Sequence, residues 1–292
     1  PFLREENKKM QEIKIKCPAK LNLSLDITGI RPDGYHELEM LMQTVDICDY
    51  LTVSVSNGSG IEISSDSSDV PCGESNTAYK AAKLFYEAIK KEKKVKIFIE
   101  KNIPQGAGMG GGSADAAGVL KALGEIENHP LSEEELLKIA LETGADVPFC
   151  FKGGAALCCG IGELMTPVKP IKNVYAVILK PGVSVSTPWA YKAFDREKYP
   201  FHPKTKLLIG ALEAFDYSAF EKFGGNSLEN PVFREHKIIG ELKNSLKELG
   251  AFYSLMTGSG SAVYGMFKEE TSARTALKKL ENKAEKSFLI KL

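Results

Sequence analysis

The sequence predicts an α+β protein with two parts, and three features carry that prediction. Strand patterns dominate the beginning, where apolar residues alternate with polar ones over 13–29 and further short strands fit 50–55 and 61–64. A glycine-rich loop at 104–117 stands between a strand pattern and an alanine-rich helix pattern. The later part, from about residue 168, alternates strands and helices in an α+β manner.

The composition is that of a globular protein without a strong charge preference. The 292 residues fit one large or two ordinary domains, and 43% of them are hydrophobic while 26% are charged. Lys plus Arg number 38, as do Asp plus Glu, so the net charge is near zero. This balance argues against a general nucleic-acid or membrane-surface binder. No apolar run approaches the ~20 residues of a membrane span, and no signal-peptide pattern is visible.

The cysteines and histidines give no sign of a metal site. The six cysteines form no Cys-x-x-Cys pair, and the four histidines lie far apart in the sequence, which argues against zinc. Most cysteines stand in apolar surroundings, as reduced core residues do, so we expect a cytoplasmic protein. Residues 1–9 precede the first strand pattern, and we expect them to be a vector-derived tag or disordered.

Capping residues and helical spacing define two helices in the first part. One begins after Asn76, a good N-cap residue. Its apolar face has helical spacing and consists of Ala78, Ala81, Ala82, Phe85, Ala88 and Ile89. The other begins at the capping box Ser132-Glu-Glu-Glu135 and ends near Thr143. Strand patterns fit 95–100 and, with a bend, 153–162.

The Pro- and Lys-rich stretch 167–173 lacks periodicity and predicts the joint between a domain of residues 1–167 and one of residues 168–292. Thr187 and Pro188 predict the N-cap and the first-turn proline of a short helix. The other segments of this part are expected as a strand at 174–179, helices over 204–249 with a break at Gly224-Gly225, strands at 252–256 and 262–268, a helix at 270–283 and a strand at 287–291.

The glycine loop offers a site for phosphate. Glycine admits positive φ and lets a ligand approach the backbone amides, and the following helix adds unpaired N–H groups and a positive dipole end. The loop lacks Gly-x-x-x-x-Gly-Lys-Ser/Thr, so it is not a Walker-type loop. Its formal match to the dinucleotide fingerprint is weak in so glycine-rich a stretch. We therefore expect a nucleotide there, with a flexible linker as the alternative.

Two other segments contain residues suited to binding. Lys20 lies between small residues on an apolar strand, so it needs an anionic partner unless it faces water from an edge strand. In Arg31-Pro-Asp-Gly-Tyr-His36, a turn presents Tyr35 and His36 together. A stacking ring beside an imidazole suits a planar ligand such as a base, although an ordinary turn with a packed tyrosine fits the local pattern equally well.

Two further segments stay open on local pattern alone. Asp146 follows Gly144, the expected C-cap of the preceding helix, and is either a structural turn cap or a catalytic group. The small-residue loop Met256-Thr-Gly-Ser-Gly-Ser-Ala262 lies between two strand patterns. It is either a tight turn or a second loop that closes on phosphates or substrate.

Taken together, these segments resemble the GHMP kinase superfamily over nearly the whole chain. The three motifs of that superfamily fall at 16–25, 104–117 and 256–265. The strings Asp33-Gly-Tyr-His36 and Gly144-Ala-Asp-Val-Pro148 separate one branch from relatives that act on mevalonate, galactose or homoserine. The resemblance implies that branch's activity: ATP-dependent phosphorylation of the 2-hydroxyl of a cytidine-diphosphate ester of methylerythritol, in the non-mevalonate pathway to isoprenoids.

The resemblance also implies an architecture and partners. It implies an N-terminal ribosomal-protein-like α/β domain, a C-terminal ferredoxin-like α+β domain and an active site in the cleft between them. ATP and a divalent cation, Mg²⁺, are the implied cofactors. The implied partner is a small-molecule substrate with a cytidine diphosphate group, with no nucleic-acid or membrane partner, for a monomer or homodimer.

Residue by residue, the resemblance carries over as follows. Asp146 matches the catalytic aspartate and Lys20 its partner. The positions that match ATP contacts are Asn76, Lys101, Pro104, Gly106, Gly108, Gly110, Gly111, Gly112 and Ser113. The positions that match substrate contacts are Asn22, Tyr35, His36, Thr187, Tyr191, Gly258 and Ser259. Among these, the two tyrosines would stack on the faces of the cytosine ring and the histidine would hydrogen-bond its edge.

The chain departs from the superfamily pattern near the helix start. Met109 stands where relatives usually have Leu, and Ala114 and Asp115 stand where they often have Ser and Asn. The metal ligand therefore stays open between Ser113 and Asp115. Two other functions compete: another small-molecule kinase of the superfamily, of mevalonate or sugar type, and a non-catalytic RNA-binding module, because the first-domain fold also occurs in ribosomal proteins.

Overall fold

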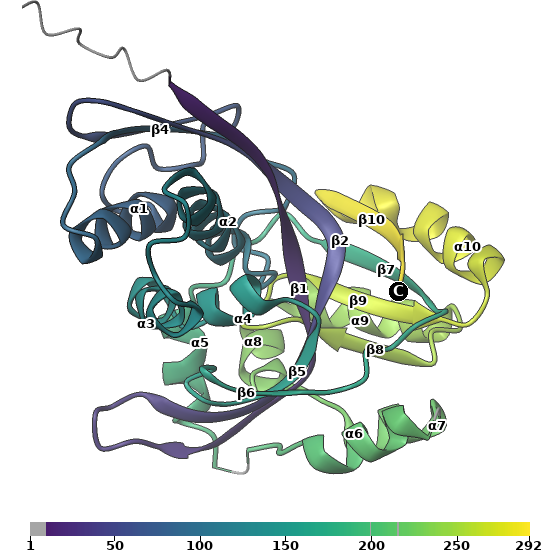
Figure 1. Cartoon of the computed structure of the whole chain (residues 1–292). Helices are drawn as coiled ribbons and strands as arrows, with labels where there is room; N and C mark the ends of the chain where they lie inside the picture. The colour runs from purple at the N-terminus through teal and green to yellow at the C-terminus, as the bar shows by residue number, and fades with distance from the viewer. Residues whose placement is uncertain (1–9, 199, 215) are drawn as a thin grey trace, which may run out of the picture. The chain divides into compact units, whose positions relative to one another are not determined.

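The computed structural model describes residues 10–198, 200–214 and 216–292 (Figure 1). The expectation for residues 1–9 lies outside this range. The Cα positions form two compact units. Unit 1 contains the described residues up to Pro18, together with Cys48–Asn102 and Gly111–Phe151; unit 2 contains Ala19–Ile47, Ile103–Gly110 and Lys152–Leu292. The domain division at residue 167 stays a prediction.

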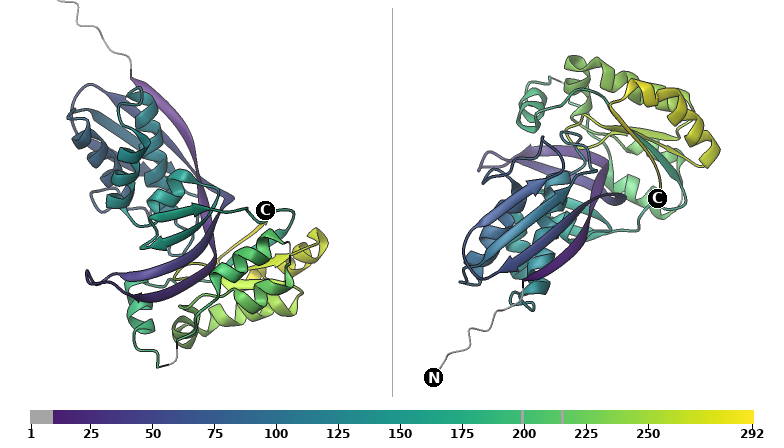
Figure 2. Two further views of the ribbon diagram at one scale, coloured as in Figure 1. Left: turned by 60° about the horizontal axis from the view of Figure 1, so that its bottom comes forward. Right: turned by 90° about the horizontal axis from the view of Figure 1, so that it is seen from above.

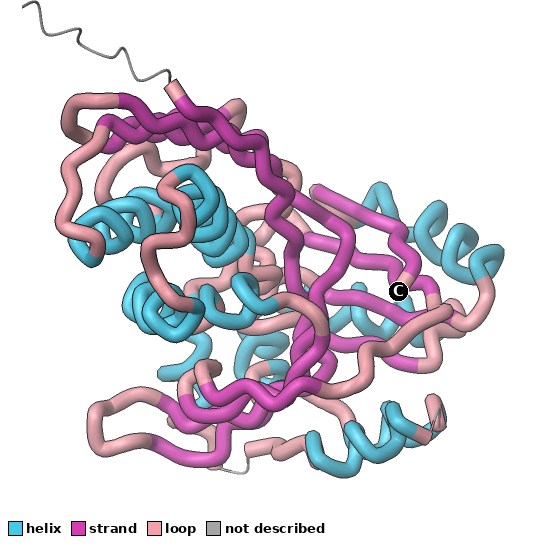
Figure 3. The backbone as a smooth tube through the Cα atoms, viewed as in Figure 1, coloured by secondary structure: helices cyan, strands magenta, loops and turns pink. Residues whose placement is uncertain are grey.

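Two long paired strands run through both units. They are β1 (Gln11–Ile30) and β2 (His36–Ser56). In unit 1, the end of β2 pairs antiparallel with β4 (Lys94–Glu100), with Tyr50 opposite Glu100. Strand β3 (Ile61–Ser65) pairs parallel with β4 on its other side (Figure 3). Alternate residues of β4 are buried, which explains why the alternating pattern predicted this strand.

Four helices belong to unit 1: α1 (Thr77–Ala88), α2 (Gly111–Ile126), α3 (Glu133–Thr143) and α4 (Val147–Lys152), the last residue of which lies in unit 2. The predicted N-cap Asn76 is confirmed, because its side chain accepts a hydrogen bond from Ala78 N. The capping box of Ser132 and Glu135 is also present. On α1 the prediction of Ala88 as buried is wrong: the helix ends there and Tyr86 is buried instead.

Helix α2 packs closely against β1 within unit 1. A Cβ added to Gly118 would lie 2.2 Å from Cys17 Sγ, so only glycine fits at this crossing. The helix thereby takes a fixed position relative to the strand, and its first turn follows directly on the glycine loop.

Unit 2 contains an antiparallel sheet in the order β10-β7-β9-β8. Its strands are β7 (Tyr175–Lys180), β8 (Tyr253–Met256), β9 (Val263–Phe267) and β10 (Lys286–Lys291). Helices α9 (Lys237–Glu248) and α10 (Glu270–Leu280) pack against it (Figure 2). Strands β8 and β9 are buried along their whole length, which accounts for their continuous apolar runs.

The rest of unit 2 consists of two strands and four short helices. The start of β2 pairs with β5 (Ala155–Gly160), which in turn pairs with β6 (Leu164–Pro167). The helices are α5 (Thr187–Phe194), α6 (Thr205–Glu213), α7 (Ser218–Phe223) and α8 (Glu229–Glu235). None of the helices in the described ranges is long and apolar enough to cross a membrane.

Two predicted boundaries in the second part need correction, and a third is confirmed. The N-cap of α5 is Ser186, so Thr187 is the first helical residue and Pro188 the second, and the helix begins one residue earlier than predicted. The helix expected over 270–283 ends at Leu280 and continues as a 3-10 turn. The helical stretch 204–249 is broken at Gly224-Gly225 as predicted.

Candidate active site

The glycine loop has the backbone conformation that the sequence predicts. Gly106, Gly108 and Gly110 have φ values of +60°, +71° and +72°, a region that side chains strongly disfavour. Helix α2 begins at Gly111, so Gly111 and Gly112 form its first turn and the helix starts two residues before Ser113. The loop therefore leads straight into a helix N-terminus with its unpaired N–H groups, as a phosphate site requires.

A second loop, residues 256–262, packs on the glycine loop within unit 2. Ser261 N donates to Gly106 O at 3.0 Å, and Ala262 N donates to Ala107 O at 3.2 Å. A Cβ on Gly108 would lie 2.1 Å from the carbonyl oxygen of Thr257. The second loop is therefore more than a turn between strands, because it fixes the course of the glycine loop.

Lys20 and Asn22 extend this arrangement along β1. Lys20 N donates to Met109 O at 3.0 Å, and Lys20 Nζ donates to Asn22 Oδ1 at 2.6 Å. Asn22 N donates to Thr257 Oγ1 at 3.1 Å, and this hydroxyl donates to Gly108 O at 3.2 Å. Lys20 is only 3% exposed, so the alternative of an edge-strand lysine facing water is wrong.

Asp146 lies between two helices of unit 1. Helix α3 ends at Thr143 with Gly144 as its C-cap, as predicted, and α4 begins at Val147. The carbonyl of Asp146 accepts a hydrogen bond from Cys150 N at 3.1 Å, and the residue is half-buried. Because Asp146 belongs to unit 1 and Lys20 to unit 2, their pairing stays a prediction.

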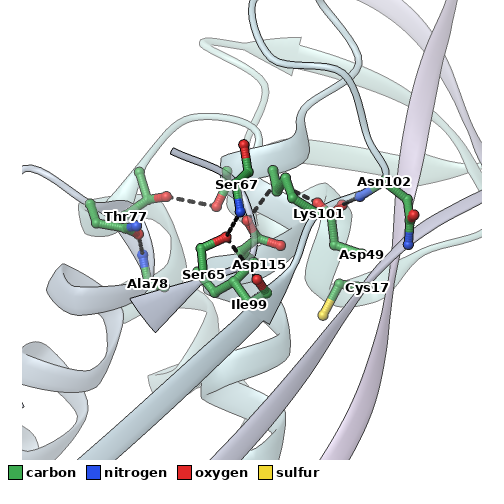
Figure 4. A network of polar contacts seen from close by, with 12 residues as sticks. Cys17, Asp49, Ser65, Ser67, Thr77, Ala78, Ile99, Lys101, Asn102 and Asp115 are labelled. Carbon is green, nitrogen blue, oxygen red and sulfur yellow. Dashed lines mark hydrogen bonds and ion pairs between the residues drawn. The ribbon is translucent and has the colours of Figure 1, made fainter. Parts of the chain in front are cut away.

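Unit 1 holds a buried ionic cluster of Asp49, Lys101 and Asp115 beside the start of α2 (Figure 4). Lys101 Nζ donates to Asp49 Oδ2 and, at 2.7 Å, to Asp115 Oδ2. Asp49 Oδ1 accepts from Asn102 N at 2.6 Å. The cluster thus ties the segment that enters the glycine loop to the helix that leaves it. Sequence reasoning found Lys101 and Asp115 but missed Asp49.

The ionic cluster shifts the pKa values of its members. Burial raises the pKa of Asp115 to about 7, although Lys101 opposes the shift and Asp49 adds to it. Burial alone would lower the pKa of Lys101, but the two carboxylates outweigh it and raise that pKa. Asp115 Oδ1 has no hydrogen-bond partner among the described residues, which makes a neutral carboxyl there easier to accommodate.

Two residues at the start of α1 make side-chain hydrogen bonds within unit 1. Asn76 donates from Nδ2 to Pro71 O at 2.7 Å while its oxygen caps the helix, so its amide is already engaged. Thr77 Oγ1 donates to Gly112 O at 2.7 Å and thereby joins the starts of α1 and α2. Thr77 carries no sequence signal for this contact, since it reads as an ordinary first-turn residue.

In unit 2, the structure brings His36 and Tyr191 together. Their ring centroids lie 4.8 Å apart with the planes tilted by 37°. Tyr35 directly precedes His36 on the turn and is 62% exposed. His36 also contacts Asp195, which sequence reasoning missed because it lies 159 residues away and follows the end of α5 without any motif.

The start of α5 is joined to the second loop. The Thr187 and Ser259 hydroxyl groups form a hydrogen bond of 2.8 Å. Gly258 is buried, and its carbonyl accepts from Asn226 Nδ2 at 2.7 Å. Within unit 2, therefore, one connected set of contacts links the predicted substrate residues of α5 to the glycine loop.

Comparisons with known proteins agree with this geometry. The family model described as GHMP kinases N terminal domain matches residues 76–154, and that described as GHMP kinases C terminal matches residues 208–286. A 4-diphosphocytidyl-2-C-methyl-D-erythritol kinase of Clostridium beijerinckii is 42% identical over 95% of this chain and 99% of its own. One of Clostridium botulinum is 44% identical over 92% of this chain and 96% of its own.

Solved structures show the same likeness. A crystal structure of a 4-(cytidine 5'-diphospho)-2C-methyl-D-erythritol kinase has a TM-score of 0.79 and 35% identity, covering 95% of this chain and 98% of that chain. The crystal structure of an L. major mevalonate kinase has the same fold, with a TM-score of 0.75 at 14% identity, covering 97% of each chain. The chain belongs to the GHMP kinase family, in the group of the 4-diphosphocytidyl-2-C-methyl-D-erythritol kinases.

Proposed function

We propose that this kinase transfers the γ-phosphoryl group of ATP to the 2-hydroxyl of 4-diphosphocytidyl-2-C-methyl-D-erythritol, giving the 2-phosphate and ADP, in the non-mevalonate pathway to isoprenoids. The names of its relatives support this substrate. The observation that carries the proposal is the contact between the tilted rings of His36 and Tyr191, with the exposed Tyr35 next to His36 in the sequence, because such a cluster suits a pyrimidine ring.

The glycine loop and α2 would hold the phosphates of ATP. The positive φ values at Gly106, Gly108 and Gly110 support this role, since backbone amides in such conformations form anion-binding concavities. Gly111, Gly112 and Ser113 would add the free N–H groups of the helix start. Pro104, Asn76 and Lys101 are proposed to lie near the nucleotide, on the strength of the family resemblance.

Asp146 and Lys20 are proposed as the catalytic pair. Asp146 would orient the 2-hydroxyl and accept its proton while the hydroxyl oxygen bonds to the γ-phosphorus and the bond to the bridging oxygen of ADP breaks. Lys20 would stabilise the charge on the moving phosphoryl group. Its burial and its hydrogen bond to Asn22 support a fixed position for the ammonium group.

A divalent cation, Mg²⁺, fits Ser113 better than Asp115. Asp115 is buried and lies 2.7 Å from the Lys101 ammonium group, so it already has a cationic partner and is less suited to hold a second cation. Ser113 is half-buried in the first turn of α2. Held near Ser113, Mg²⁺ would help to neutralise the negative charge of the phosphates.

The substrate residues would divide between the two ends of the acceptor. Tyr35 and Tyr191 would stack on the cytosine ring, and His36 would bond its edge. Asn22 would contact the methylerythritol end, and Gly258, Ser259 and Thr187 would line the path between them. The hydrogen bond between the Thr187 and Ser259 hydroxyls supports their joint role.

A coupled ADP-release assay tests this proposal. The enzyme is supplied with ATP, Mg²⁺ and the cytidyl substrate, beside mevalonate, galactose and homoserine as competing acceptors. We expect ADP release with the cytidyl substrate alone. Turnover of another acceptor would move the substrate assignment, and binding of RNA in a salt-dependent manner without ADP release would support a non-catalytic module instead.

A further inference from the structure

His36 is held by two contacts within unit 2. Its Nε2 lies 2.7 Å from Asp195 Oδ1, and its ring lies against Tyr191. The side chain of His36 is 15% exposed and that of Asp195 is 34% exposed, so both side chains are partly accessible to solvent. These contacts fix both the position of the imidazole ring and its rotation.

The contact with Asp195 determines which nitrogen carries the proton. An ionised carboxylate can only accept a hydrogen bond, so Nε2 must donate. In a neutral imidazole the other nitrogen, Nδ1, then has a lone pair and accepts. The described part of the chain records no hydrogen bond at Nδ1, which leaves this acceptor available to a ligand.

We propose that Asp195 is a specificity-determining positioning residue: by fixing His36 with Nδ1 as an acceptor, it selects a pyrimidine with an amino group at C4 over one with a carbonyl there. Cytosine donates from its C4 amino group, whereas uracil presents an oxygen at the same place. Opposed acceptors repel and leave a polar group without a partner. This inference rests on the proposed function, in which His36 bonds the edge of the base.

The tautomer can be measured in the enzyme without any substrate. The chain has four histidines, so the ¹⁵N signals of His36 can be assigned by comparing the wild-type protein with a His36→Gln variant. We expect the neutral imidazole of wild-type His36 to show a protonated Nε2 and an unprotonated Nδ1. In Asp195→Ala we expect averaged shifts from a mixture of tautomers. A protonated Nδ1 in the wild-type enzyme would overturn the inference.

The specificity is measured by comparing kcat/KM for the cytidyl substrate and its uridyl counterpart. In Asp195→Ala we expect the ratio of the two to fall about tenfold, because one matched hydrogen bond is lost. The change should appear in the KM of the cytidyl substrate, with the KM of ATP unchanged. Asp195→Glu, which keeps an accepting carboxylate, should restore much of the ratio.

Glu197→Ala is the matched control. Glu197 lies two residues further along and pairs with Arg234 instead of His36, so this variant removes the same charge without touching the imidazole. It should keep the wild-type ratio. An active wild-type enzyme whose ratio is unchanged in Asp195→Ala would overturn the inference alone. A wild-type enzyme inactive on both pyrimidine substrates would overturn the proposed function and the inference with it.

Discussion

At the scale of single residues, the position of Gly108 is set by its neighbours in unit 2 as much as by any ligand. Its φ of +71° strains every L side chain, and a Cβ would meet the carbonyl oxygen of Thr257. The sequence predicted the conformation, since five glycines stand so close together. It could not predict the contact, because the two residues are 149 positions apart.

Replacing Gly108 by alanine should therefore destabilise the protein. We expect a loss of at least about 1–2 kcal/mol from the left-handed backbone alone, with the clash adding to it, and a weaker affinity for ATP. The free energy of unfolding in urea measures the first effect. Gly182→Ala is the control, since a Cβ there meets nothing within 4 Å and its φ lies outside the left-handed range. Equal midpoints for the two variants would contradict the prediction.

Asp146→Asn and Lys20→Ala should each lower kcat on the order of 10²–10³-fold, as expected when a preorganised catalytic group is removed. Circular dichroism should show both variants folded. Glu142→Gln, an exposed acid near the end of α3, serves as the control and should keep wild-type turnover. Normal turnover in either catalytic variant would refute the role of that residue.

The raised pKa of Asp115 makes stability depend on pH. The folded carboxyl titrates at about 7, against 3.8 for the ordinary side chain, so between these values the folded state binds a proton that the unfolded state has released. This group's contribution to the free energy of unfolding is therefore present at low pH and is lost as pH rises toward 7. Urea titrations from about pH 5 to about pH 8 measure it.

Asp115→Asn carries no such proton, so the difference in stability between the wild-type protein and this variant should change in favour of the variant as pH rises. Lys101 keeps one carboxylate partner, Asp49, in the variant. A difference that is constant over this pH range would show that Asp115 is already ionised at the acidic end.

At the scale of elements, the helices and strands that the sequence did not predict correctly have local physical causes for the error. Helix α4 was not predicted because Pro148 reads as a helix breaker, yet proline is tolerated in a first turn, where its missing N–H leaves no bond unmade. The start of α5 shifted by one residue because Ser186 and Thr187 are both acceptable caps. Only 50–55 of β2 was predicted, and its residues 36–49 were missed because polar residues, among them Asp46 and Asp49, interrupt the apolar pattern there. Asp49 can be buried because it pairs with Lys101, and this tertiary contact cannot be predicted from the local sequence.

Asn76→Ala tests whether the cap of α1 also serves the nucleotide. Loss of the cap should cost about 1 kcal/mol of stability, and loss of the bond to Pro71 should add to it. Ser132→Ala removes a comparable cap from α3, at a residue that is not proposed to contact the nucleotide. If Asn76 contacts the nucleotide, the KM for ATP should rise in Asn76→Ala and stay unchanged in Ser132→Ala. An equal KM for ATP in the two variants would show that Asn76 caps the helix without contacting the nucleotide.

At the scale of the whole molecule, the sequence predicts the family and most elements, because motifs and periodicity are local signals. The strands of unit 2 follow from such signals and are confirmed, whereas their order in the sheet, β10-β7-β9-β8, depends on pairing between distant segments and was not predicted. Two features of the candidate site also do not follow from local signals. They are the hydrogen bond between His36 and Asp195, and the ion pair by which Asp49 joins the cluster of Lys101 and Asp115. Each joins distant segments through single polar contacts that leave no pattern along the chain.

The packing of residues 257–262 on the glycine loop has a consequence for how the protein is made. The ribosome delivers the glycine loop early, but the backbone groups that hold Gly106 and Ala107 belong to Ser261 and Ala262. Until residues 257–262 have been made, a nascent chain thus carries its proposed phosphate-binding segment without the partner that gives it a fixed shape. Stalled chains that end before residue 257 should not retain ATP, so nucleotide can assist folding only after the second loop has been synthesised.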